Sequence, residues 1–257
     1  MQNSMTRTNP KRLRQEPLIE AIWHLTYRPS KPIQAVADVL VGVLYTALKK
    51  RNGDYQVHRL LPVDIPTEVA EQDPDLRYTV KYRLENPDSP VLYLIGDRIV
   101  SLNCRRPYIG WQRLREEIAF LKGVLEESEL IIPERHGLRY IDLIRREYMS
   151  DLSGLQLQVR VGEQEVRTQP IHLRVELDYL DRKHTVRISS PAQAEIAGET
   201  WNGTLIDLEV GVQIENSWHA ISDNAIDELH HALNSLFFTQ ILTQDLIDKL
   251  EPEYKED

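Results

Sequence analysis

The chain contains one cysteine, Cys104, among its 257 residues. A single cysteine excludes a disulfide within the chain and any zinc site that needs several thiolates. It fits a reducing compartment, and we expect the protein to be cytoplasmic. Because no Cys-His motif accompanies Cys104, we expect its side chain to fill space in the core rather than to act as a nucleophile.

Long hydrophobic runs are also absent. A membrane-spanning helix requires about 20 consecutive apolar residues, and the nearest approach, Val36 to Leu44, is interrupted by Asp38. The N-terminal region has no apolar stretch of the kind found in secretory signals. We therefore expect a chain that neither spans a membrane nor is exported by that route.

Motifs for known chemistry are missing as well. The sequence has no P-loop, no dinucleotide-binding glycine pattern, no nucleophile elbow and no metalloprotease helix. Its histidines and acidic residues do not recur at a recognised metal-ligand spacing. The sequence predicts no metal, no cofactor and no catalytic residue, which favours a non-enzymatic protein.

Charge and composition limit the partners. The 40 acidic residues exceed the 31 lysines and arginines, giving a formal charge of −9, which disfavours broad binding to nucleic acid or anionic membranes. A hydrophobic content of 41% is sufficient to fill a substantial core. At this length the chain can form one large domain or two of ordinary size.

The middle of the chain has the clearest structural pattern. Two β-prone runs, Val91 to Ile95 and Ile99 to Leu102, predict a hairpin with its turn at Gly96-Asp97. A helix over 108–127 follows, which Pro107 would open beside Arg105-Arg106. Its predicted buried stripe consists of Trp111, Leu114, Ile118, Leu121 and Leu125.

The second half predicts an antiparallel meander followed by a helix. Alternating segments indicate strands at 155–161, 171–179, 184–189 and 204–214, and helical spacing indicates one long amphipathic helix over 225–250. The outward row of the second strand is charged, and we expect it to form cross-strand charge pairs. This row consists of His172, Arg174, Glu176 and Asp178, and Asp207 with Glu209 continues the outward charged rows later in the meander.

These patterns predict an α+β fold with two strand-rich halves, each ending in a long amphipathic helix packed on a largely antiparallel sheet. The predicted divisions are a disordered basic tail over residues 1–16, an N-terminal half over 17–135 and a C-terminal half over 136–257. A single continuous sheet with both helices on one face is the alternative.

One set of residues is a candidate ligand site. Two guanidinium groups beside two aromatic rings at a helix start can hold a carboxylate, a phosphate or a planar ring. The set consists of Arg105, Arg106, Tyr108 and Trp111, with Arg139 and Asp142 as expected neighbours. Alternatively, the aromatic rings are core, the arginines pair with nearby acids, and Arg139 with Asp142 braces the sheet. The sequence favours this structural interpretation.

A second candidate is a basic strand face formed by Arg77, Lys81 and Arg83, which alternate with apolar residues. Such a face can bind phosphates or an acidic partner. Charged residues on a solvated face of an antiparallel sheet are the commoner explanation.

Several strings resemble a family of proteins. They are EPLIEAIWHLTY, QDPDLRY, GDRIVSLNCRRPYIGW, RHGLRYIDLI and LFFTQILTQDLIDKLEPEY, and they cover most of the chain from Pro17 to Tyr254. Together they resemble a sporadically distributed prokaryotic family of about 260 residues with no assigned activity. The resemblance implies an accessory role, beside defence or mobile-element systems, and it supplies no catalytic residues.

Three functions follow as expectations. The first is a non-enzymatic accessory protein that binds another protein. The second is a sensor or enzyme for a small anion, such as a nucleotide or a phosphorylated metabolite, at the arginine and aromatic set. The third is a nucleic-acid binder that uses the basic strand face.

Overall fold

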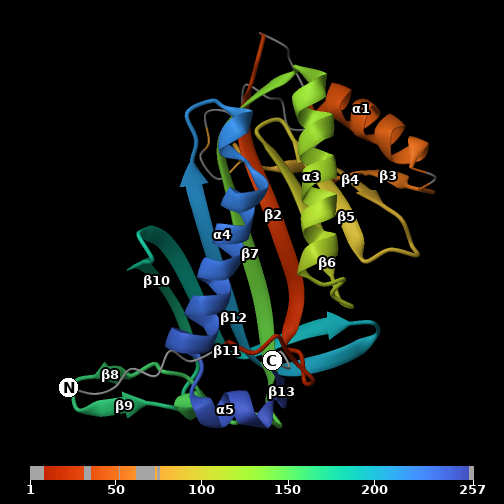
Figure 1. The fold of residues 1–257 in the computed structure, drawn as a ribbon. Helices are drawn as coiled ribbons and strands as arrows, with labels where there is room; N and C mark the ends of the chain where they lie inside the picture. Colours follow the sequence, from red (N-terminus) through yellow and green to blue (C-terminus); the bar gives the residue numbers. More distant parts are fainter. Residues whose placement is uncertain (1–8, 32–35, 52, 62–72, 74–75, 255–257) are drawn as a thin grey trace. The chain divides into compact units, whose positions relative to one another are not determined.

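The computed structural model describes residues 9–31, 36–51, 53–61, 73 and 76–254. Antiparallel strand pairs and helices confirm the predicted α+β class (Figure 1). The chain divides into two compact units: unit 1 takes residues 1–19, 139–210 and 230–257, and unit 2 takes 20–138 and 211–229. The units combine segments that are far apart in the sequence, whereas the predicted halves are continuous. The division into two helix-terminated halves stays a prediction.

Unit 2 consists of strands with two helices beside them. In its sheet the neighbours of β2 run in the order β6, β5, β4, β3. Its main elements are β2 (Leu18–Pro29), α1 (Val36–Lys50), β3 (Gln56–Arg59), β4 (Val80–Glu85), β5 (Val91–Gly96), β6 (Ile99–Arg105), α3 (Trp111–Ser128) and η3 (Trp218–Ala220). Helices α1 and α3 lie next to each other, α1 against β4 and β5 and α3 against β6.

The predicted hairpin is confirmed as β5 and β6, which pair antiparallel from Val91↔Cys104 to Ile95↔Val100. Its turn lies one residue later than predicted, because Gly96 still belongs to β5 and β6 begins at Ile99. Gly96 is needed in the strand for close packing: a Cβ at this position would lie 2.1 Å from the carbonyl oxygen of Thr79.

Helix α3 buries four of the five residues of its predicted stripe, and Trp111 is only half-buried. The helix begins at Trp111 rather than beside the arginine pair. The reason is Gly110, whose φ of 86° is a left-handed conformation that interrupts the helical path after Pro107. Pro107 therefore lies in the turn that precedes the helix.

Unit 1 contains three of the four strands of the predicted meander; the first, expected over 155–161, is reduced to β8 (Val159–Val161), which pairs with β9 (Gln164–Val166) in a separate two-stranded sheet. Its strands lie in the order β10, β11, β12, β7, and β10–β11 and β11–β12 are antiparallel. Its elements are β1 (Arg12–Leu13), β7 (Ile131–Arg145) from Arg139 onward, η2 (Leu152–Gly154), β8 (Val159–Val161), β9 (Gln164–Val166), β10 (Ile171–Tyr179), β11 (Arg182–Ile196), β12 (Glu199–Gln213) up to Val210, α4 (Asp223–Leu236) from His230 onward, η4 (Phe237–Ile241), α5 (Gln244–Lys249) and β13 (Pro252–Glu253).

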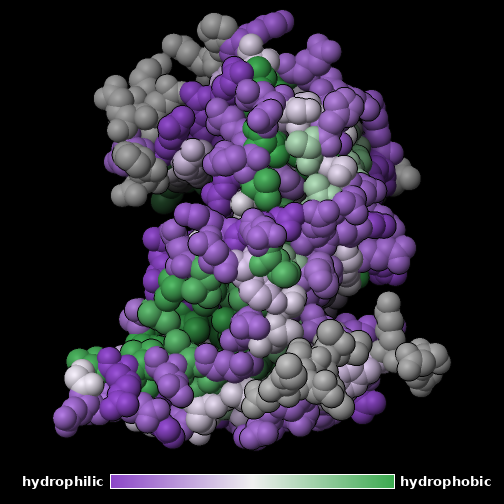
Figure 2. Space-filling model, turned by 60° about the vertical axis from the view of Figure 1, so that its left-hand side comes forward, coloured by the Kyte–Doolittle hydropathy of each residue, from purple (hydrophilic) through white to green (hydrophobic). Residues whose placement is uncertain are grey.

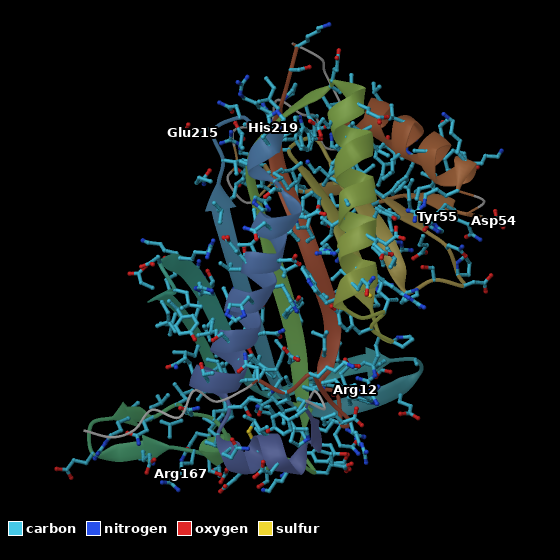
Figure 3. All side chains as sticks on the ribbon, viewed as in Figure 1. Arg12, Asp54, Tyr55, Arg167, Glu215 and His219 are labelled. Atoms are coloured by element: carbon cyan, nitrogen blue, oxygen red, sulfur yellow. The ribbon has the colours of Figure 1, made fainter. Side chains whose placement is uncertain are left out.

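The prediction of a disordered tail over residues 1–16 is wrong for its second half. Strand β1 pairs antiparallel with β13, and both Arg12, labelled in Figure 3, and Arg14 bond the carboxylate of Glu253. The two guanidinium groups lower the pKa of Glu253 to about 2 through these hydrogen bonds. Residues 1–8 lie outside the described part of the chain.

The prediction of one helix over 225–250 is also wrong. Helix α4 ends at Leu236, a π-helical turn follows at η4, and α5 begins after Thr243. The Thr243 hydroxyl caps α5 by accepting from the amide of Leu246, and the Thr243 amide donates to the carbonyl of Gly154 (2.9 Å). These contacts satisfy backbone groups outside a helix, so the chain turns here.

Candidate functional site at the edge of strand β10

The candidate ligand residues divide between the two units. Arg105, Arg106, Tyr108 and Trp111 belong to unit 2, whereas Arg139 and Asp142 belong to unit 1. Within unit 2, Trp111 donates its indole N–H to Oδ1 of Asp227 (2.8 Å), and Arg115 bonds Oδ2 of the same carboxylate (2.7 Å). The partner of Trp111 is therefore an acid that the sequence did not connect with it.

Loss of the shared carboxylate of Asp227 should reduce stability by a modest, measurable amount. Asp227→Ala should lower the free energy of unfolding by about 1–2 kcal/mol, because it removes the acceptor of both Trp111 and Arg115. Arg115→Met should cost less, because the indole bond remains. Urea unfolding followed by tryptophan fluorescence measures both. A loss that is equal in the two variants would contradict the importance of the indole bond.

Arg139 braces the sheet of unit 1, but its partner is not Asp142. Its guanidinium makes two hydrogen bonds of 2.7 Å to the carboxylate of Asp207, which is 3% exposed. Arg187 lies 3.4 Å from the same carboxylate and 3.1 Å from Glu209. The charges of this network are paired across β7, β12 and β11, which is a structural arrangement rather than an open anion site.

Asp142 is a buried carboxyl group with 5% exposure. Burial raises its pKa to about 8, and the negative charges of Glu16 and Asp207 act in the same direction. The carboxyl group is therefore mostly neutral at pH 7. A neutral carboxyl group does not repel an anion, and it can donate one hydrogen bond through its O–H.

The three residues of the predicted basic strand face do not form a common row. Lys81 is buried and pairs with Asp97 at 2.6 Å. Arg83 pairs with Glu85 at 3.0 Å, and the Arg77 guanidinium lies 5.7 Å from the ring centre of Tyr78, in the turn before β4. A register shift in the β4–β5 pairing occurs at Lys81, which breaks the predicted alternation.

A groove of about 940 Å³ lies between α1 and α3 in unit 2. Arg51, on its rim, already bonds Glu117 through two contacts of 2.9 Å. The lining includes small apolar residues, among them Val39, Gly42, Val43, Ala119 and Gly123, and also polar ones such as Thr46, Lys50, Glu127 and Ser128.

Neither a metal-binding cluster nor a candidate membrane-spanning helix occurs in the described part of the chain. No three histidine, cysteine, aspartate or glutamate side chains come together there as a metal-binding group. Within the same residues, none of the helices combines the length and the apolar character that crossing a membrane demands.

Strand β10 is the outermost strand of the sheet in unit 1, and no strand of the described residues lies beyond it. It has nine residues, pairs with β11 without a register shift, and contains no proline. Natural edge strands are commonly short, bulged or interrupted by proline, which prevents pairing with other chains. β10 has none of these three protections.

The hairpin turn determines which backbone groups of β10 face the open edge. Leu180 and Asp181 both have positive φ (48° and 57°), and Tyr179 pairs with Arg182. This is a two-residue turn of the type I′ kind, which makes Tyr179 and Arg182 a hydrogen-bonded pair. Because such pairs alternate in an antiparallel ladder, the odd-numbered residues bond β11 and the even-numbered residues direct their N–H and C=O groups outward.

The side chains of β10 form two rows. The odd row is apolar and lies on the side of α4 and η4, since the hydroxyl of Tyr179 bonds Ser235 (2.7 Å) and Thr239 (3.2 Å). Within it, Leu177 is 38% exposed. Figure 2, which brings the left-hand side of Figure 1 forward, shows hydrophobic residues gathered at the height of β10 and the β8–β9 hairpin.

The even row is charged, and the expected cross-strand pairing occurs in part, since Asp178 lies opposite Lys183 of β11. Arg174 lies opposite Arg187 of β11, so these two positions carry the same charge. Arg187 turns to Asp207 and Glu209, while Arg174 bonds Glu176 of its own strand (3.0 Å). Within β10, Arg174 and Glu176 remain more than half exposed. They can therefore meet charges on an incoming strand.

Protein-family models were compared with the chain and none matches, and a comparison with curated proteins also found no match. The functional assignment therefore depends on the geometry of the chain itself. The sequence contained the signal for the β10 surface, an alternation of apolar and charged residues over 171–179. It did not contain the position of that strand at the edge.

Proposed function

We propose that the protein is a non-enzymatic interaction protein, which binds another protein by adding a strand of that partner to the open edge of β10. The observation that carries this proposal is the outward-facing backbone of His172, Arg174, Glu176 and Asp178. Four consecutive outward positions offer N–H and C=O groups to an extended segment, as in known cases of β-strand addition.

The rows on either side of the backbone add specificity. An incoming strand that alternates apolar and charged residues would place its apolar side chains beside Leu173, Val175 and Leu177. Its charged side chains would lie beside Arg174 and Glu176, whose opposite signs select for register. Backbone hydrogen bonds supply most of the affinity in this mode of recognition, and side chains select the partner.

Several charges of the other candidate surfaces are already paired within the chain, which supports this proposal. The arginines and acids of unit 1 pair with each other across the sheet. The buried lysine of the predicted basic face is paired with Asp97. No observation favours the anion or the nucleic-acid alternative, so neither is proposed.

A proline substitution tests the proposal at the backbone. A library of nine-residue peptides with alternating apolar and charged residues would be selected for binding to the chain, and the selected peptides measured by fluorescence anisotropy. Glu176→Pro removes one outward N–H, and proline is tolerated on an open edge. We expect about tenfold weaker peptide binding, because one backbone hydrogen bond and its neighbours are lost.

The matched control is Glu176→Ala, which keeps the backbone N–H and removes only the carboxylate. It should bind the same peptides more tightly than Glu176→Pro. Hydrogen exchange on the unsubstituted chain supplies a second measurement, since bound peptide should slow exchange at the amides of Arg174, Glu176 and Asp178. Peptides that bind equally to both variants and leave these amides unchanged would overturn the proposal.

A further inference from the structure

The sequence of β10 is complementary to itself. When two copies of the strand run antiparallel with Val175 opposite Val175, position i faces position 350 − i. Arg174 then faces Glu176 of the other copy, and His172 faces Asp178. On the apolar side, Leu173 faces Leu177, and the strand ends Ile171 and Tyr179 face each other, so the whole of the strand is paired with no overhang.

The backbone permits this register. Even-numbered residues carry the outward N–H and C=O groups, as the type I′ turn requires. In the register centred on Val175, every even residue faces another even residue, so 172 with 178 and 174 with 176 form hydrogen-bonded pairs. A shift by one residue would place outward groups of one strand against inward groups of the other, and the ladder could not form.

Charge favours the register centred on Val175 over the neighbouring registers. A shift by two residues in one direction places Arg174 opposite Arg174, and a shift by two in the other direction places Glu176 opposite Glu176. Like charges directly opposite each other in a sheet are destabilising. Only the register centred on Val175 combines the correct backbone parity with opposite charges at positions 174 and 176.

We infer that the chain forms a two-fold symmetric homodimer in which the β10 strands of two copies pair antiparallel about Val175. The two-fold axis is perpendicular to the plane of the joined sheet, so the apolar rows of both copies lie on the same face. The two copies use the same patch, as closed symmetric dimers do. Both this inference and the proposed function use the open edge of β10, so a second copy of the chain and a strand of another protein would compete for it.

Self-pairing also accounts for the exposed apolar side chains near this strand. Leu177 and Leu180 are 38% and 47% exposed. In the dimer, Leu177 gains Leu173 of the other copy as its neighbour across the strands, and Leu180 lies beside Pro170 of that copy. The dimer therefore removes apolar surface from water in addition to completing the backbone pairing.

Charge exchange tests the register by sedimentation velocity over about a hundredfold range of concentration. Arg174→Glu creates two symmetric Glu–Glu pairs and Glu176→Arg two Arg–Arg pairs, so each variant alone should dimerise on the order of tenfold more weakly. An equimolar mixture of these two variants restores opposite charges and should dimerise like the unsubstituted chain. The double variant R174E/E176R should do the same.

Cysteine substitution tests the symmetry of the pair. Val175→Cys places two thiols opposite each other at a non-hydrogen-bonded position, where Cβ atoms are about 4.5–5.5 Å apart, and mild oxidation should link the two copies. Leu173→Cys alone should not link, because its counterpart is position 177. A mixture of L173C and L177C should link. The unsubstituted chain, whose Cys104 is buried, is the control.

The outcomes separate this inference from the proposed function. A chain that stays monomeric throughout, or a dimer that Arg174→Glu does not weaken and Val175→Cys does not cross-link, overturns the homodimer. If the selected peptides still bind such a chain, the proposed function survives. Conversely, a dimer with the predicted charge and cysteine behaviour supports the inference, and if the library then yields no peptide that binds the unsubstituted chain at concentrations where it is monomeric, the recruitment of other proteins is overturned.

Discussion

Replacing Lys81 with methionine should lower the free energy of unfolding by about 3–5 kcal/mol, because it leaves the charge of Asp97 buried without its cation. The two groups lie 2.6 Å apart with side-chain exposures of 6% and 9%. Asp97 also accepts a hydrogen bond from the amide of Ala37 in the first turn of α1 (3.2 Å). Loss of Lys81 therefore affects the contact of β4, the β5–β6 turn and α1 together.

The matched control is Arg83→Met on the same strand. Arg83 pairs with Glu85 at 3.0 Å, but both side chains are about one-quarter to one-third exposed. Water screens this pair, so its loss should cost at most about 1 kcal/mol. Chemical unfolding followed by circular dichroism measures the difference. Equal losses in the two variants would show that burial does not strengthen the Lys81–Asp97 pair.

Asp142 should dominate the pH dependence of stability between its ordinary pKa of 3.8 and its folded pKa of about 8. Its folded pKa of about 8 lies above the ordinary value of 3.8. Between these values the folded chain holds a proton that the unfolded chain releases. Stability should therefore fall as pH rises, by about 1.4 kcal/mol for each pH unit within this window. Below the ordinary pKa both states are protonated, so Asp142 no longer makes the stability depend on pH.

Asp142→Asn removes the titrating group at nearly constant volume. The variant should exceed the unsubstituted chain in free energy of unfolding by roughly 5 kcal/mol near pH 8, and the difference should shrink towards zero near pH 4. Urea unfolding of both proteins at several pH values measures it, with the acidic measurements as the internal control. A difference that does not depend on pH would contradict a raised pKa at this position.

Some features of the fold could be predicted because they depend on local periodicity. The stripe from Leu114 to Leu125 repeats at helical spacing, and the β10–β11–β12 meander alternates at strand spacing. Both patterns report which side chains avoid water, which is the largest favourable contribution to folding. The structure confirmed them.

Other features depend on contacts that sequence spacing does not encode. Lys81 was predicted on an exposed basic row, but the register shift at this position and the approach of Asp97 bury it. Trp111 was grouped with Arg105 and Arg106, but its hydrogen-bond partner, Asp227, is separated from it by 116 residues. A charged residue is predicted to be exposed unless its partner is known.

The sequence by itself determined the α+β class, the main amphipathic elements and the two alternating rows of residues 171–179. Only the tertiary structure decided that β10 lies at an open edge, that its even-numbered backbone groups face outward, and that the positive charge of Arg187 is directed away from it. The physical reason is the separation in sequence of the residues involved. Periodicity depends on the geometry of neighbouring residues, whereas strand order and charge pairing depend on segments that meet only after folding.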